Sequence, residues 1–452
     1  MRKTSWCGLL GLAFALAMCG AARAADVKSL HAPRGEEVWY VSDHTLPMIA
    51  MSVALPAGSA YDPQGKFGLS VFAASLLDEG AGNLDANAFQ TALSNRAIRL
   101  SASPSRDYLI ISLVTLTDNA RDAFQLLGLA LSKPRFDPDA IQRVRGQIVS
   151  SMAQEDEDPP TVAAKALYKT YFHDHPYAHP VNGDTASVGA INQADLKSFA
   201  AEHWVRGDLR IAVAGDVDAA TLTALLNTAF GHLPAKTPGL PSWPGHVGQP
   251  GVQVTPLPVP QPSVAFALPG LLRTDRDFIP AFVANYIVGG GGFSSRLTNE
   301  LRVKRGLTYD ISTSLDSYRR AGIMAGEFAT KQESVQQAIG VVRDTLRDFA
   351  ENGPTDSELA DAKTYLTGSF PMSFSSNVGI VAELNGFQQV GLPIEYVRNR
   401  NALIDAVTVA DLKRAARRVF NPRAITIVVA GSLTGGQPAR PSNSGEAHGA
   451  RH

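Results

Sequence analysis

Cysteine is almost absent from this chain. Only two of its 452 residues are cysteines, Cys7 and Cys19, and both lie close to the start. A disulfide framework or a cysteine-based metal cluster therefore cannot exist further along the chain. Thiol catalysis is excluded there for the same reason, and no G-x-S-x-G sequence offers a serine nucleophile elbow instead.

The chain also has little net charge and no long apolar run after its first residues. The 41 Lys and Arg residues balance 42 Asp and Glu residues, which leaves only a local basic patch as a route to nucleic acid. Beyond the first residues no apolar segment reaches the roughly 18 residues that a membrane helix needs, so we expect no membrane span. The 45% hydrophobic content excludes wholesale disorder. A chain of 452 residues is too long for one core, which predicts two or three domains.

Residues 1–24 have the pattern of a cleavable signal peptide. Arg2 and Lys3 precede a short apolar run, and Ala22-Arg23-Ala24 is a small-x-small cleavage site. Cleavage there leaves a chain without cysteine, which suits an oxidising compartment. We therefore expect a periplasmic protein if the source is Gram-negative. Lipoprotein processing at Cys19 is the alternative, and Met18 before it is a poor match to that signal.

The rest of the chain contains two related halves. INQADLKSFAAEHWVRGDLRIAVAGDV at 191–217 matches VTVADLKRAARRVFNPRAITIVVAGSL at 407–433 without a gap, at a constant offset of 216. Each copy predicts a helix, capped near Asn192 or Thr408, followed by a buried strand that ends at glycine. A gapless match over this length favours duplication over chance similarity.

These signals predict the domain organisation. The segment 238–262 contains eight prolines counting both ends, so it excludes a helix or a central strand and indicates a semi-rigid linker. We expect an N-terminal domain at 25–237, a C-terminal domain at 263–434 and a disordered polar tail at 435–452. Each domain has strands followed by amphipathic helices and a final strand. This order predicts an α+β fold with two homologous domains, each a mixed, mostly antiparallel sheet packed by helices.

The sequence resembles the pitrilysin-type, or inverzincin, zinc metallopeptidases over nearly the whole chain after residue 24. That family carries H-x-x-E-H on a helix of its first half, where two histidines hold zinc and the glutamate activates water. The aligned stretch here is GLSVFAASLLDEG at 68–80. Val71 and Ser75 occupy the histidine positions and Ala74 the glutamate position. The distal ligand of the family falls within 147–151 (QIVSS), which holds no carboxylate. The resemblance therefore implies a degenerate site and no metal in this chain.

Other histidines do not replace the missing motif. His175 and His179 have the i, i+4 spacing, but Pro176 and Pro180 break the helix that such a pair needs. His448 and His452 fall in the expected tail, and no glutamate lies inside either pair. We interpret His173 to Pro180 as a structural loop, with metal binding as the alternative.

The second family signature is retained. SSRLTNELRVKRGLTY at 294–309 places an arginine and, seven residues later, a tyrosine at the positions where active members project substrate-binding side chains. These positions are Arg302 and Tyr309, whose side chains can donate hydrogen bonds to a peptide carbonyl and a developing oxyanion. The alternative is a surface helix residue and a strand packing residue. The glycine run 289–292 lacks the ending of a phosphate-binding loop, and the resemblance implies a possible substrate contact there.

The N-terminal half has lost the zinc motif, whereas the C-terminal half retains the Arg/Tyr signature. The resemblance therefore implies that another chain supplies the zinc. Some members of the resembled family pair two chains, one with zinc and one with the Arg/Tyr pair. We therefore expect a non-zinc-binding subunit of a heterodimeric metallopeptidase that acts on peptides. A homologous H-x-x-E-H subunit would hold the zinc. The alternative is a non-catalytic binding or scaffold protein of the same fold.

Overall fold

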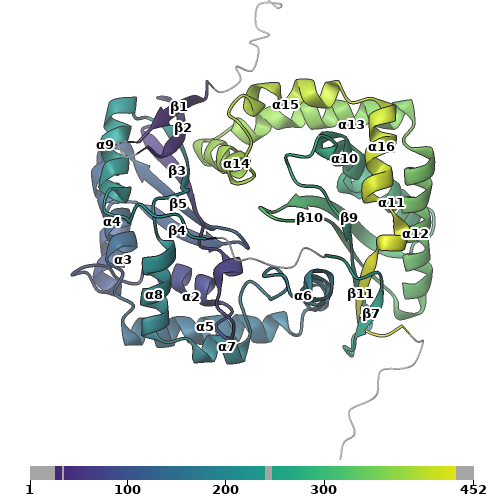
Figure 1. Cartoon of the computed structure of the whole chain (residues 1–452), viewed down its shortest axis with the longest axis horizontal. Helices are drawn as coiled ribbons and strands as arrows, with labels where there is room; N and C mark the ends of the chain where they lie inside the picture. The colour runs from purple at the N-terminus through teal and green to yellow at the C-terminus, as the bar shows by residue number, and fades with distance from the viewer. Residues whose placement is uncertain (1–25, 33–34, 240–246, 434–452) are drawn as a thin grey trace, which may run out of the picture.

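A computed structural model describes residues 26–32, 35–239 and 247–433 of the chain. The expected signal peptide and the expected tail lie outside these residues. Two halves face each other, with the N-terminal half on the left of Figure 1 and the C-terminal half on the right. Each half holds one sheet that is covered by helices on its outer side. The predicted α+β class with two related halves is confirmed.

The N-terminal sheet has the strand order β1-β2-β6-β3-β5-β4. Strands β2 and β6 run parallel, and the other neighbouring strands pair antiparallel. The strands are β1 (Lys28–His31), β2 (Glu37–Ser42), β3 (Met48–Leu55), β4 (Arg99–Pro104), β5 (Leu109–Leu116) and β6 (Arg210–Gly215). The helices are α2 (Leu69–Ser75), α3 (Ala86–Ser94), α4 (Ala120–Ser132), α5 (Pro138–Glu155), α6 (Pro159–Phe172), α7 (Thr185–Ala190), α8 (Gln193–His203) and α9 (Ala219–Phe230).

The C-terminal sheet repeats this arrangement in the order β7-β11-β8-β10-β9, again with one parallel pair, β7 with β11. The strands are β7 (Gly251–Thr255), β8 (Ser263–Pro269), β9 (Thr308–Ser317), β10 (Gly322–Thr330) and β11 (Thr426–Ala430). The helices are α10 (Phe278–Asn285), α11 (Arg296–Thr298), α12 (Val335–Asn352), α13 (Asp356–Ser369), α14 (Asn377–Gln389), α15 (Tyr396–Asp405) and α16 (Val409–Val419).

The duplicated sequence forms the same element in both halves. Helix α8 begins after Asn192, which exchanges capping hydrogen bonds with Asp195, and α16 begins after Thr408, which does so with Asp411. Each reciprocal pair satisfies backbone N–H groups that a helix start leaves without partners. The strands that follow, β6 and β11, occupy the same position in their sheets. The predicted duplication is confirmed.

The proline-rich segment 238–262 contains a strand that the sequence did not predict. Strand β7 lies inside it and pairs with β11 at the edge of the C-terminal sheet. An edge strand needs partners on one side only, so flanking prolines are tolerated there although they would disrupt a central strand.

The two halves exchange a helix. Helix α6 of the N-terminal half packs on β8 and β11, while α14 of the C-terminal half packs on β3 and β6. The central strands are therefore buried on both faces. Ile211 and Val213 of β6 point into the core of their own half, and the smaller Ala212 and Ala214 point towards α14. Alanine on that face lets the exchanged helix approach the sheet closely.

Hydrogen bonds and an ion pair also join the halves. The side-chain amide of Asn385 on α14 donates to the backbone oxygen of Arg210 at 2.8 Å. The hydroxyl oxygens of Tyr168 and Tyr318 lie 2.8 Å apart, and Arg319 forms an ion pair with Asp208 at 2.8 Å. The halves are thus held by polar contacts as well as by the exchanged helices. No helix within the described ranges is long and apolar enough to cross a bilayer.

Candidate functional site

The helix expected to carry a metal motif is short and firmly anchored. Helix α2 begins after Gly68, whose φ of +90° is the left-handed conformation that favours glycine. The buried carboxylate of Asp62 accepts hydrogen bonds from the backbone amides of Gly68 (2.7 Å) and Ser70 (2.8 Å). Burial raises the pKa of Asp62 to about 7, against the lowering effect of these bonds. Asp62 therefore fixes the first turn of α2 as a structural cap.

The three motif positions on α2 offer no zinc ligands. Ala74 is buried, Val71 is partly buried, and Ser75 is exposed. Neither Val nor Ala has a lone pair for a metal, and a serine hydroxyl does not replace imidazole. Helix α2 packs on α5, which carries the segment 147–151, and no carboxylate occurs in that segment. Within the described part of the chain, no group of three or more His, Cys, Asp or Glu residues could hold a metal ion. The residues at these positions do not fit zinc.

The histidines of the loop after α6 have structural contacts. His175 is buried, its Nδ1 accepts a hydrogen bond from the backbone amide of Tyr177 at 3.0 Å, and the two rings lie 4.2 Å apart. Burial and, to a smaller extent, the nearby charge of Arg106 together lower the pKa of His175 to about 4. His179 stacks on Phe67 with 4.2 Å between ring centroids. These contacts account for both rings through packing.

Arg302 and Tyr309 lie together on the surface of the C-terminal half. Arg302 belongs to the π-helical turn Asn299–Val303, and Tyr309 is the second residue of β9. Gly306, with φ of +60°, makes the turn between them. The guanidinium carbon of Arg302 lies 4.6 Å from the ring centroid of Tyr309, and 82% of Tyr309 is exposed. The two sequence-predicted donors therefore share one site.

A third residue, Phe293, completes this site and was not predicted. It follows the glycine run, is 77% exposed, and its ring centroid lies 4.6 Å from the guanidinium carbon of Arg302. Arg302 thus contacts two exposed aromatic rings, an arrangement that the guanidinium group favours. The sequence signal for this residue was an aromatic side chain directly after four glycines. That signal does not show that Phe293 contacts Arg302, because the contact depends on the fold of the loop.

The charge of Arg302 is not neutralised by a neighbour. Lys304 and Arg305, on the same turn, both pair with Glu300, at 2.6 and 2.5 Å. In contrast, no carboxylate among the described residues lies within ion-pair distance of Arg302. Both rings contact the guanidinium group, whose N–H groups can donate to an acceptor oxygen. A peptide carbonyl or a carboxylate has the required geometry.

The two candidate regions lie in different halves. Figure 1 shows α2 in the left half and α11, which leads into the Arg302 turn, in the right half. The exchanged helices and the Arg319–Asp208 ion pair hold these halves together. Arg302 and the α2 positions therefore belong to opposite halves of the molecule.

Comparison with known proteins identifies the family. Residues 37–185 match the family described as "Insulinase (Peptidase family M16)", and residues 190–366 match "Peptidase M16 inactive domain". The chain belongs to peptidase family M16. The matched model and relatives include inactive members of the family, which supports a non-catalytic M16-fold protein.

Several M16 proteins are similar over most of their length. A "Non-peptidase homolog YmxG" of Helicobacter pylori is 27% identical over 79% of this chain and 83% of its own. The mitochondrial-processing peptidase subunit beta of Blastocladiella emersonii is 23% identical over 89% and 88%. A crystal structure of the peptidase M16 inactive domain from Pseudomonas fluorescens superposes with a TM-score of 0.85 and 28% identity, covering 91% of this chain and 99% of that one.

Proposed function

We propose that this protein is the non-zinc-binding subunit of a heterodimeric metalloendopeptidase. It pairs with a homologous M16 chain that carries H-x-x-E-H and zinc, and it contributes Arg302 and Tyr309 to peptide hydrolysis at that site. The observation that carries the proposal is the half-buried Arg302, which no described carboxylate pairs with and which contacts the exposed rings of Tyr309 and Phe293, on a chain whose α2 has no zinc ligands at the motif positions. The expected signal peptide supports a periplasmic location.

The role of each side chain follows from its chemistry. The partner's zinc and glutamate supply the activated water. The N–H groups of Arg302 and the hydroxyl of Tyr309 donate hydrogen bonds to the substrate carbonyl, whose oxygen gains negative charge in the transition state. Stacking between two rings limits the motion of Arg302, so less conformational entropy is lost when it engages substrate. Extended peptides bind by adding a strand to a sheet edge, and β4 and β9 are edge strands here.

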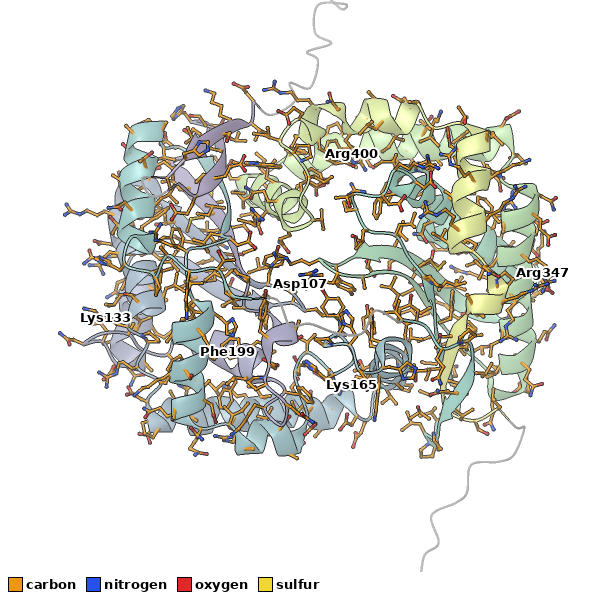
Figure 2. The ribbon with its side chains drawn as sticks, in the orientation of Figure 1. Asp107, Lys133, Lys165, Phe199, Arg347 and Arg400 are labelled. Carbon is orange, nitrogen blue, oxygen red and sulfur yellow. The ribbon has the colours of Figure 1, made fainter. Side chains whose placement is uncertain are left out.

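Reconstitution with an exported H-x-x-E-H chain tests the proposal. The two chains are expected to co-purify, and the pair is expected to cleave an unfolded peptide that neither chain cleaves alone. Arg302→Ala should lower kcat/KM by about 100-fold without preventing co-purification, and Tyr309→Phe by about 10-fold or more. The matched control is Arg347→Ala, because Arg347 lies at the outer edge of the C-terminal half in Figure 2 and forms an exposed ion pair with Asp344. Cleavage by this chain alone after metal removal would contradict the proposal, as would full activity of the Arg302→Ala pair.

The second candidate is a binding or scaffold protein of the same fold. The name of the Helicobacter pylori relative, "Non-peptidase homolog YmxG", favours it. Under this alternative the chain captures a partner or peptide, but no combination of chains yields cleavage. The reconstituted assay separates the two, because only the first candidate predicts hydrolysis that depends on Arg302.

A further inference from the structure

A small cavity lies where the two halves meet, away from the Arg302 site. Its volume is about 210 Å³, and both halves contribute to its walls. The lining includes three arginines, Arg210 on β6, Arg273 after β8 and Arg319 at the tip of the β9–β10 hairpin, and no carboxylate. Three arginines thus line one solvent-open cavity, and guanidinium groups are suited to binding an oxyanion.

Arg273 is a half-buried cation with which no described residue forms an ion pair. Its guanidinium carbon lies 4.2 Å from the ring centroid of Phe278, and its Nη2 donates a 2.5 Å hydrogen bond to the hydroxyl of Tyr396. No carboxylate in the described part of the chain lies within ion-pair distance of it. Burial lowers the pKa of Arg273, which reflects the cost of holding this charge away from water, and the charge of Arg400 lowers it further. A partly desolvated charge without a counter-ion costs stability, so an anion in the cavity would offset part of that cost.

The other two arginines share a single carboxylate. Asp208 pairs with Arg210 at 2.5 Å and with Arg319 at 2.8 Å. The Nε of Arg210 is buried and has no hydrogen-bond partner among the residues that the structure describes. One negative charge therefore serves two guanidinium groups, and at least one donor remains to be satisfied.

The nearby Asp107, Glu383 and the carbonyl oxygen of Gln389 do not supply the cavity with an acceptor for its arginines. Asp107 lies beneath the hairpin and uses both carboxylate oxygens, one for the Tyr177 hydroxyl and one for the backbone amide of Arg319. Glu383 influences both Arg273 and Arg400 but is not in ion-pair contact with either. The carbonyl of Gln389, at the end of α14, accepts a hydrogen bond from Tyr108.

We propose that this cavity binds an oxyanion, either a carboxylate or a phosphate, between Arg210, Arg273 and Arg319. A peptide chain end or acidic side chain and a free phosphate ion are two sources of the same chemistry. The ligand bridges the halves, because Arg210 comes from one and the other two arginines from the other. The proposal does not depend on a partner chain or on the role of Arg302.

Thermal unfolding of the whole chain with inorganic phosphate tests the site. At constant ionic strength, adjusted with sodium chloride, 10 mM phosphate should raise Tm by about 2 °C or more, because a ligand that binds only the folded state stabilises it. The rise should be absent in Arg273→Gln and unchanged in Arg347→Gln, whose side chain is remote from the cavity. An equal rise in all three proteins would overturn the proposal, since it would reflect a general salt effect.

A second variant keeps the test decisive if Arg273→Gln fails to fold. Leu272 lines the same cavity and is 40% exposed, so Leu272→Glu would place a carboxylate beside the three arginines. This variant should have a raised Tm without phosphate and no further rise with it. Unaltered phosphate binding by Leu272→Glu would refute the site.

Paired peptides identify the source of the oxyanion. One peptide with a free C-terminal carboxylate and the same peptide as an amide are titrated by calorimetry with and without phosphate. Binding of the acid alone, displaced by phosphate, assigns the cavity to a peptide carboxylate. Binding of phosphate alone assigns it to the free ion. Failure of both probes to bind contradicts the proposal.

Discussion

Asp107 of the N-terminal half accepts a 2.9 Å hydrogen bond from the backbone amide of Arg319 in the C-terminal half. Its other oxygen accepts the hydroxyl of Tyr177. Figure 2 shows Asp107 in the middle of the molecule, between the two halves. One buried carboxylate therefore connects the loop after α6 to the hairpin of the opposite half.

Removing this acceptor should weaken the interface. Asp107→Ala removes the acceptor of the buried Tyr177 hydroxyl and of the part-buried Arg319 amide, so we expect the free energy of unfolding to fall by about 2–4 kcal/mol. Asp107→Asn keeps an acceptor oxygen and should cost less. Urea denaturation measures both, with Asp344→Ala on the exposed face of α12 as the control, expected within about 0.5 kcal/mol of the unmodified protein. An Asp107→Ala protein as stable as this control would show that the contact does not hold the halves.

His175 should make stability depend on pH. Its pKa falls from 6.5 to about 4 on folding, so between these values the unfolded chain binds a proton that the folded chain does not. This contribution is present above pH 6.5 and is lost as the pH falls towards 4, by up to roughly 3 kcal/mol. His175→Asn retains an acceptor for the Tyr177 amide but does not titrate. The difference in unfolding free energy between the two proteins should therefore shift over pH 6.5 to 4, and a constant difference would exclude this explanation.

Phe293 should act through Arg302. Phe293→Ala removes one of the two rings that hold the guanidinium group, so we expect kcat/KM of the reconstituted pair to fall by about 3- to 10-fold. Phe293→Tyr keeps a ring and should retain most of the activity. Combining Phe293→Ala with Arg302→Ala should add little to the effect of Arg302→Ala alone. Fully additive effects would mean that Phe293 acts independently of Arg302.

Restoring the motif on α2 should not by itself restore tight zinc binding. The triple variant Val71→His, Ala74→Glu, Ser75→His gains two imidazoles, whereas a catalytic zinc site needs three protein ligands. Zinc affinity, measured by competition with a chelating dye, should rise about 10-fold or more when one glutamate is also introduced within 147–151 on α5. Stoichiometric, tight zinc binding by the triple variant alone would contradict this interpretation of the helix.

Local signals in the sequence were sufficient to predict most helices and strands. Helix starts were marked by two kinds of residue. The capping pairs Asn192/Asp195 and Thr408/Asp411 accept hydrogen bonds from the backbone N–H groups that a helix start leaves without partners. Pro138, at the first position of α5, has no backbone N–H group to satisfy. Helix α10 ends at Asn285, and the chain continues from it as a π-helical turn into the glycine run.

Long-range relationships were not accessible from the sequence. Helix α6 has the pattern of any amphipathic helix, and nothing local indicates that its partners, β8 and β11, lie in the other half. The stacking of Phe293 on Arg302 and the meeting of Arg210 with Arg319 near Asp208 likewise depend on the fold of separate segments. The placement of Arg302 beside Tyr309 followed from the family signature, and their role in hydrolysis stays a prediction.

The exchange of α6 and α14 has a consequence for how the protein is made. Ribosomes release the N-terminal half first, yet Ala212 and Ala214 face a helix that begins only at Asn377. Until that late segment is synthesised, one apolar face of the first sheet stays exposed to solvent and prone to aggregation. Newly synthesised chains should therefore need holding factors or rapid completion, and a premature stop before α14 should yield an aggregating fragment rather than a smaller working unit.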